Sequence, residues 1–243
     1  MKKLVILATC VAAMALGSSA NAVTYFGENT NPGQAVSGAP LTAHNTFLAQ
    51  LTGVSVEDFE GFAAGPAPAS LSFTGSAGAI NAAFSGSSGQ ICATPSCGGS
   101  TRFATSGSHY FDVSSTITAA FSTPIAAFGF YGTDVGDISG QLSLVLHHAT
   151  GPDTVIVIPH TVGAPDGSLL FFGVIDTANP FISVSFLNSQ AGNDFFGFDD
   201  MIVGDVQQVT GGVPEPTTWA MMVGGLALAG AAMRRRKVSV SFA

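Results

Sequence analysis

The sequence predicts an all-β protein, built as a single jelly-roll-like antiparallel β-sandwich. Short runs rich in Val, Ile, Phe and Thr recur about every ten residues through the middle of the 243-residue chain, separated by Gly, Pro, Asp and Ser. Apolar and polar residues alternate within several runs, as in residues 181–186 and 142–146, which is typical of strands with one buried and one solvent-facing side. No repeat of fixed period occurs in the sequence, which excludes a solenoid or a propeller.

About ten strands in roughly 200 residues fit one jelly-roll domain. Within this body, residues 42–51 have the best helical spacing, but the apolar stripe is too short to predict a helix with any force. The body is therefore expected to be β-structure almost throughout. The predicted strands are Val54–Phe59, Ala79–Phe84, His109–Val113, Ile117–Phe121, Ile125–Tyr131, Leu142–His147, Thr154–Ile158, Leu169–Ile175, Phe181–Leu187 and Phe195–Val203.

Glycines stand between bulky rings in two of these strands. The runs are Phe128-Gly129-Phe130-Tyr131 and Phe195-Phe196-Gly197-Phe198. Glycine in such a position marks a β-bulge or a place where a neighbour packs very closely against the strand. Most of the 19 phenylalanines are expected to form the core.

Charge is distributed very unevenly along the chain. Six of the 7 basic residues lie at the two ends, which leaves Arg102 alone in the body. Glu215 lies near the C-terminus, so the body holds the other 14 of the 15 acidic residues. A body of this charge repels phosphate backbones, which excludes nucleic acid as a partner.

The N-terminus has the pattern of a secretory signal peptide over residues 1–22. Two lysines are followed by an uncharged apolar run, and small residues at 20 and 22 precede a predicted cleavage between Ala22 and Val23. The apolar run is too short for a retained membrane span. The mature chain is therefore predicted to begin at Val23, and the β-sandwich ectodomain to occupy residues 23–210.

The C-terminus combines a proline-rich linker, an apolar run and a basic cluster. Residues 211–218 contain Pro-Glu-Pro, residues 219–233 are uncharged, and residues 234–243 begin with Arg-Arg-Arg-Lys. Fifteen residues of helix cover about 22 Å of a hydrocarbon core of about 30 Å, and flanking residues and snorkelling arginines can close the gap. The run is therefore predicted to be a transmembrane helix, with the basic residues in the cytoplasm and the body outside.

This tail closely resembles the PEP-CTERM sorting signal, in particular its PEPxxWA subtype. The same type of tail is sometimes labelled an ice-binding protein C-terminal domain. The resemblance implies recognition by exosortase, a membrane transpeptidase of Gram-negative bacteria that make exopolysaccharide. The extension over residues 238–243 departs from the family, whose signals usually end soon after the arginines. The residues that match the pattern are Pro214, Glu215, Pro216, Trp219, Arg234, Arg235 and Arg236.

Cys92 and Cys97 are the two cysteines left after removal of the signal peptide. An even number of cysteines in an oxidising compartment predicts a disulfide, which here would close a small loop.

The acidic residues suggest a structural calcium site. Glu60 lies near the start of the body, and Asp199 and Asp200 lie near its end. Because the first and last strands of a jelly roll are often neighbours, these carboxylates are expected to converge on Ca²⁺, with solvent-facing or turn-capping roles as the alternative. Asp134 and Asp137 form a second acidic loop without the ligand register of an EF-hand, which favours a turn.

Three classes of function remain open. We favour a non-enzymatic protein of the cell surface or extracellular matrix, associated with exopolysaccharide or biofilm, because the sequence holds no HExxH, no Gly-x-Ser-x-Gly and no alternating acids of a β-sandwich glucanase. The alternatives are a calcium-dependent carbohydrate-binding or adhesion module and a secreted glycan hydrolase. Before processing, the protein is expected at the inner membrane facing the periplasm, and afterwards at the surface or outside the cell.

Overall fold

The computed structural model describes residues 22–31, 35–86, 89–97, 101–114, 116–190, 195–210 and 224–226. Contacts within the chain define a compact unit, Asn21–Gly212, which contains every strand. Of the other unit, Met1–Ala20 with Val213–Ala243, only residues 224–226 are described, and they are helical. The predicted signal peptide up to residue 21, the linker, most of the membrane span and the basic tail lie outside the described residues.

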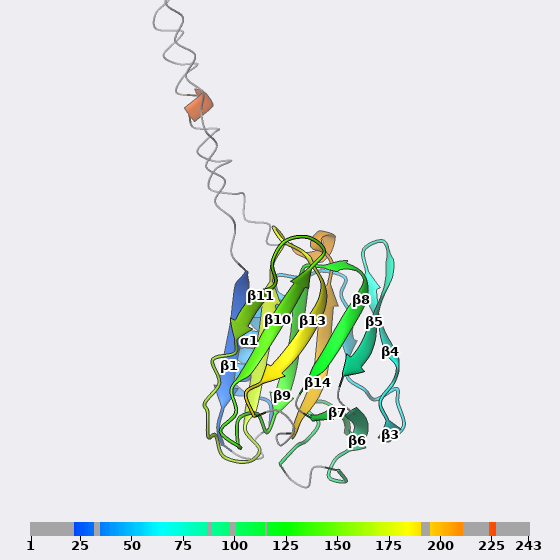
Figure 1. Cartoon of the computed structure of the whole chain (residues 1–243), viewed down its shortest axis with the longest axis vertical. Helices are drawn as coiled ribbons and strands as arrows, with labels where there is room; N and C mark the ends of the chain where they lie inside the picture. The colour runs from blue at the N-terminus through cyan, green and yellow to red at the C-terminus, as the bar shows by residue number, and fades with distance from the viewer. Residues whose placement is uncertain are drawn as a thin grey trace, which may run out of the picture. The chain divides into compact units, whose positions relative to one another are not determined.

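The compact unit is a sandwich of two antiparallel sheets (Figure 1). The larger sheet has the order β1-β12-β9-β14-β7-β6-β3, with β2 paired to β14, and the smaller has the order β11-β10-β13-β8-β5-β4. From β7 to β10 and again from β11 to β14, successive strands alternate between the two sheets, which is jelly-roll-like connectivity. The larger sheet consists of β1 (Val23–Asn29), β2 (Val56–Glu57), β3 (Gly65–Pro66), β6 (Gly89–Ala93), β7 (His109–Ser114), β9 (Ala127–Thr133), β12 (Leu169–Ile175) and β14 (Phe195–Gly204). The smaller sheet consists of β4 (Ser70–Gly75), β5 (Gly78–Gly86), β8 (Ile117–Ile125), β10 (Leu142–His148), β11 (Thr154–Val157) and β13 (Phe181–Asn188).

The two sheets differ in how their outer faces are treated. In the smaller sheet, buried and exposed residues alternate, as in β4 and β13. In the larger sheet, every residue of β9 and β12 is buried. Strands that are buried on both faces need a cover on the side away from the sandwich core.

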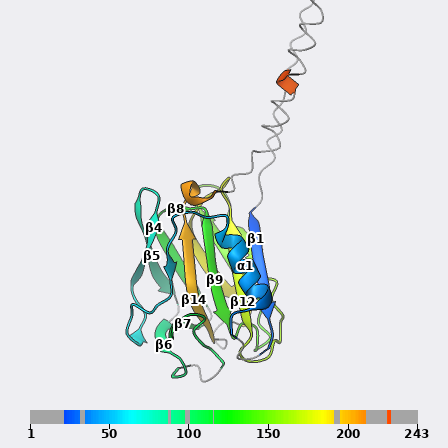
Figure 2. The ribbon, with the colours of Figure 1, turned by 180° about the vertical axis from the view of Figure 1, so that it is seen from behind.

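Helix α1 (Gly38–Leu48) provides part of that cover. It packs against β1, β12 and β9 on the outer face of the larger sheet (Figure 2). Phe47 is fully buried there, in a second hydrophobic cluster that is separate from the sandwich core. The segment contains several poor helix formers, so packing of this face rather than helix propensity stabilises it.

Close approach of α1 depends on glycines in the sheet. A Cβ on Gly173 or Gly129 would lie 2.6 or 2.7 Å from the Phe47 ring, and one on Gly27 would lie 2.1 Å from the backbone oxygen of Ala39. Gly173 and Gly129 are paired across β12 and β9, so they form the floor on which the Phe47 ring rests.

The prediction of an antiparallel jelly-roll-like sandwich is confirmed, and all ten predicted strands are present. Leu169–Ile175 has the predicted bounds, and the other nine strands have shifted ends. The expectation of β-structure almost throughout the body is wrong over α1, because the helix is held by its contacts with the sheet. The sequence also does not predict β1, β4 and β6. It does not predict β3 either. Strands β3 and β6 are short, β4 pairs with neighbouring β5 in a hairpin, and β1 pairs with β12 from a distant part of the chain.

Substitution Gly173→Ala is expected to destabilise the protein by about 1–3 kcal/mol, because the added Cβ overpacks the Phe47 ring. Urea unfolding of the full-length protein measures the loss. Gly61→Ala is the matched control, since a Cβ there meets nothing within 4 Å. Equal unfolding free energies for the two variants would contradict this account of how α1 docks.

Candidate functional site

The loop of residues 101–108, called the acid-anchored loop below, covers the part of the larger sheet's outer face near β7 and β14. Its residues are tied down by carboxylates from several separate segments, each of which accepts hydrogen bonds from the loop or from the residue that follows it. The carboxylates are Glu60, Asp112, Asp134, Asp199 and Asp200.

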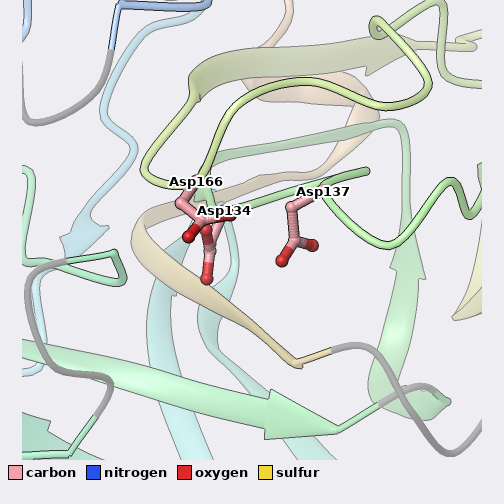
Figure 3. Close-up of side chains that lie close together, drawn as sticks. All are labelled: Asp134, Asp137 and Asp166. Carbon is pink, nitrogen blue, oxygen red and sulfur yellow. The ribbon is translucent and has the colours of Figure 1, made fainter.

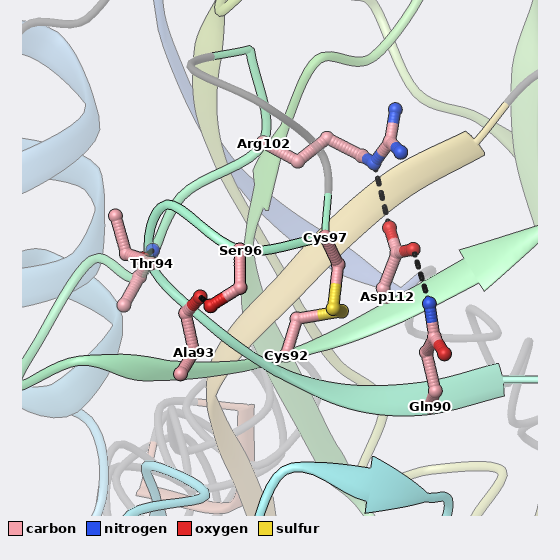
Figure 4. The surroundings of a disulfide bond; sticks show 9 residues. Gln90, Cys92, Ala93, Thr94, Ser96, Cys97, Arg102 and Asp112 are labelled. Atoms are coloured by element: carbon pink, nitrogen blue, oxygen red, sulfur yellow. Dashed lines mark hydrogen bonds and ion pairs between the residues drawn. A yellow bond between two sulfur atoms is a disulfide. The ribbon is translucent and has the colours of Figure 1, made fainter.

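Arg102 is the only Lys or Arg residue of the body, and its side chain lies in this site. Its Nε lies 2.6 Å from an Asp112 oxygen on β7, and its Nη1 lies 3.4 Å from Asp134 Oδ2 at the end of β9. Both carboxylates are almost completely buried, and the guanidinium also lies 5.5 Å from the centre of the Phe195 ring. Gln90 of β6 approaches the second oxygen of Asp112 at 3.5 Å (Figure 4). One cation therefore compensates two buried acids.

Asp199 and Asp200 hold the middle of the loop. Asp199 Oδ2 accepts hydrogen bonds from the backbone N–H groups of Thr105 and Ser106 at 2.6 and 3.1 Å. Asp200 Oδ1 accepts one from the Ser106 hydroxyl at 2.7 Å. The two acids lie at the β-bulge where the pairing of β14 with β9 shifts register, and Asp200 adopts φ +47°. The bulge turns both side chains toward the loop.

The Thr105 hydroxyl lies between the carboxyl groups of Asp199 and Asp200. Its Oγ1 lies 3.0 Å from Asp199 Oδ2 and 2.9 Å from Asp200 Oδ2. A hydroxyl donates one proton, so a second full hydrogen bond at Thr105 Oγ1 would need a protonated carboxyl group as its donor. Burial, followed by the charge of Asp200, raises the pKa of Asp199 to about 8. Burial therefore favours the protonated form of Asp199.

Glu60 anchors the end of the loop and the start of β7. Its carboxylate accepts hydrogen bonds from the backbone N–H groups of Ser108 and His109, and these lower the pKa of Glu60 to about 2. The His109 ring lies 3.2 Å away on the same carboxylate.

The predicted calcium site of Glu60, Asp199 and Asp200 is not assembled. Their chain segments do converge, since β2 pairs with β14, but their carboxylate oxygens do not all lie within 4.8 Å of one another. The lone pairs that would bind Ca²⁺ accept hydrogen bonds from the acid-anchored loop instead. The physical reason is that backbone and hydroxyl donors satisfy these acids without a cation.

A different acidic cluster is present among the described residues. Carboxylate oxygens of Asp134, Asp137 and Asp166 lie within 4.8 Å of one another (Figure 3). Asp134 has φ +64° and accepts a hydrogen bond from the Gly167 N–H at 2.8 Å, which agrees with the predicted turn role. A cation at this point would meet the Arg102 guanidinium beside Asp134, so the geometry assigns no metal to the cluster.

Cys92 and Cys97 form a disulfide with a Cα–Cα distance of 5.6 Å, just before the acid-anchored loop (Figure 4). Val23, which is predicted to be the first residue after signal cleavage, is also the first residue of β1. The cleavage itself stays a prediction.

The sequence did not predict that Arg102 and Asp112 pair. It also did not predict that Tyr131 is buried against α1. The Tyr131 hydroxyl is buried with no hydrogen-bond partner among the described residues, and its ring stacks 5.1 Å from His44 of α1. The isolation of a single basic residue among many acids was a usable signal for Arg102.

Residues 212–237 match the PEP-CTERM protein-sorting motif. The chain carries a PEP-CTERM sorting signal. The match includes every residue predicted for that signal, from Pro214 to Arg236, although the PEPxxWA subtype stays a prediction. The PEP-CTERM motif implies export, membrane-anchored sorting and processing by exosortase. Among the described residues, no helix is long and apolar enough to cross a bilayer.

Solved structures similar to this chain are β-sandwich domains. They include the K2 cleaved adhesin domain of Lys-gingipain (12% identity, TM-score 0.39, covering 62% of this chain and 97% of that one). Another is the C-terminal family 22 carbohydrate-binding module of Clostridium thermocellum Xyn10B (12%, 0.38, 64% and 94%). At these scores the likeness carries no argument about ligands. No curated protein matches the chain at a significant level.

Substitution Asp199→Asn is expected to flatten the dependence of stability on pH. Between about pH 4 and pH 8 folded Asp199 binds a proton that the unfolded chain releases, so the unfolding free energy of the wild type falls as the pH rises. Asparagine keeps the acceptor for Thr105 and cannot ionise, so the variant should be the more stable protein above pH 8. Urea unfolding between pH 5 and pH 9 measures this, with exposed Asp58→Asn as control. Parallel plots of unfolding free energy against pH for wild type and Asp199→Asn would contradict the raised pKa of Asp199.

Substitution Arg102→Met is expected to cost roughly 2–4 kcal/mol of unfolding free energy, because it leaves Asp112 and Asp134 buried without their cation. Methionine keeps the apolar stem of the side chain, so lost packing is a small part of the effect. Arg102→Lys should lose less. Chemical denaturation at pH 7 compares the two, and a Met variant as stable as the Lys variant would contradict the role of the charge.

Proposed function

We propose that this chain is a non-enzymatic protein of the cell surface or extracellular matrix, which exosortase sorts through its C-terminal tail and which associates with exopolysaccharide. The observation that carries the proposal is the PEP-CTERM motif at residues 212–237. The motif names the export route, and the β-sandwich body is the cargo.

The charge pattern supports this division into tail and body. The cluster Arg234–Lys237 can hold one end of the apolar run on the cytoplasmic side, where basic residues are retained. The body, with its excess of acidic residues, is left outside. The prolines on either side of Glu215 hold the peptide extended just outside the membrane, in a form that a processing enzyme can grip.

The state of the carboxylates supports a role without catalysis. A glycan hydrolase requires two carboxyl groups that face a substrate across a groove. Here Glu60, Asp199 and Asp200 accept hydrogen bonds from the acid-anchored loop and hold it in place.

Substitution Glu215→Gln is expected to leave the tail attached to the protein. In cells with exosortase, mass spectrometry of the mature wild-type protein should find no peptide containing Arg234–Arg236. In cells without exosortase, and in the Glu215→Gln variant, that peptide should be retained. Thr217→Ser, in the same linker, is the matched control and should be processed normally. The same C-terminus in both strains would remove the sorting proposal.

A further inference from the structure

The outer face of the smaller sheet carries no charged side chain of Asp, Glu, Lys or Arg. This surface, called the neutral face below, is made by the residues that alternate with the core residues in β4, β5, β8, β13, β10 and β11. Its members are Ser70, Ser72, Thr74, Ala79, Asn81, Ala83, Ser85, Thr118, Ala120, Ser122, Ser143, His147, Val155, Val157, Ser183, Ser185 and Leu187.

Helix α1 covers the outer face of the larger sheet and not the neutral face (Figures 1 and 2). Val155 and Val157 on the edge strand β11 are 60% and 58% exposed, and Leu187 is 46% exposed. The body has 14 acidic residues and a single arginine. None of these charged residues lies on the neutral face.

Hydroxyl groups run across the face in register. Thr118 of β8 and Ser185 of β13 are paired, and their hydroxyl oxygens lie 2.7 Å apart. His147 Nε2 lies 2.8 Å from the same Ser185 oxygen, and its Nδ1 lies 2.8 Å from exposed Asp153 at the rim. Ser85 continues the row on β5, opposite Thr118. Each hydroxyl can both donate and accept, which suits a partner that is itself rich in hydroxyls.

The composition of the neutral face argues against a protein partner. Protein interfaces are enriched in aromatic residues, Met and Arg and depleted in Ser and Ala, which is the reverse of what this face presents. Six strands about 4.8 Å apart and about six residues long give roughly 600 Å². Two copies face to face would bury about 1,200 Å², at the lower limit for a specific complex, and their acidic bodies would repel one another.

The charge of the body argues against an anionic polymer. A uronate or phosphate chain would approach a strongly acidic protein and find no Lys or Arg on this face to bind it. An uncharged polysaccharide has no such cost. Its hydroxyls can pair with the Ser, Thr and Asn side chains, and its C–H surfaces can lie on the Val, Ala and Leu methyl groups.

We propose that the neutral face binds uncharged polysaccharide, weakly at each site and through many copies of the protein. The proposal rests on the association with exopolysaccharide proposed above and names its surface and its chemical class. The face offers no aromatic platform, so the affinity of a single site is low. Presentation of many copies on one surface then raises the effective affinity.

Affinity electrophoresis of the full-length protein in mild detergent tests this, with dextran, galactomannan or alginate cast into native gels. Wild type should be retarded by at least one of the two uncharged polymers and not by alginate. Ala120→Glu, at the centre of the face between Ser183 and Ala83, should reduce the retardation at least about threefold. Asn45→Glu adds the same charge at an exposed position of α1, away from the neutral face, and should leave retardation unchanged.

Further variants keep the outcome decisive. Ala83→Glu should act like Ala120→Glu if the latter loses stability, and Ala120→Trp should increase retardation by adding a ring on which a sugar can stack. Retardation by alginate, equal binding of wild type and both Glu variants, no retardation by either uncharged polymer, or a loss of binding in EDTA would overturn the proposal. A dimer in light scattering that Ala120→Glu dissociates would assign the face to a second copy instead.

Failure of this proposal and failure of sorting by exosortase are distinguishable. Ala120→Glu should lose polysaccharide binding and keep normal C-terminal processing. Glu215→Gln should lose processing and keep the retardation of the wild-type protein. A Glu215→Gln protein that also failed to bind would contradict the separation of the two sites.

Discussion

The shortage of positive charge is the constraint on which the rest of the body depends. One arginine faces 14 acidic residues, and several of the acids are buried. Buried carboxylates need compensation from a cation, a proton or hydrogen-bond donors. Here Arg102 serves Asp112 and Asp134, N–H and O–H groups of the acid-anchored loop serve Asp199 and Asp200, and the Asn179 N–H serves Asp176. Burial also raises the pKa of Asp199 to about 8. The acid-anchored loop is therefore fixed by the charges that it neutralises.

The outer face of one sheet is covered and that of the other is open, because their strands differ in composition. Strands β9 and β12 are apolar along their whole length, so their outer face must be covered, and α1 docks there on a floor of glycines. Strands β4 and β13 alternate small polar residues with core residues, so their outer face can remain in water. One sheet is covered to complete the fold, and the other is left as a surface.

The sorting signal and the folded β-sandwich are separate parts of this chain. The PEP-CTERM signal at residues 212–237 gives the address, and its information lies in a short linear pattern. The cargo is defined by a folded surface, whose members come from six strands spread between residues 70 and 187. Sorting can therefore be changed at Glu215 without touching the sandwich, and the surface can be changed at Ala120 without touching the tail.

The sequence by itself determined the sorting signal, the sandwich class and the position of the ten main strands. These depend on local patterns, namely a linear motif, alternation of apolar and polar residues, and turn residues between runs. The helix Gly38–Leu48 was not determined in this way, because its stability comes from Phe47 packing on Gly129 and Gly173 in distant strands. The groups that Glu60, Asp199 and Asp200 contact were also decided only by tertiary structure. Sequence showed acids that would converge, but whether a cation or a loop fills the space between them depends on how the residues that follow the disulfide fold back over the sheet.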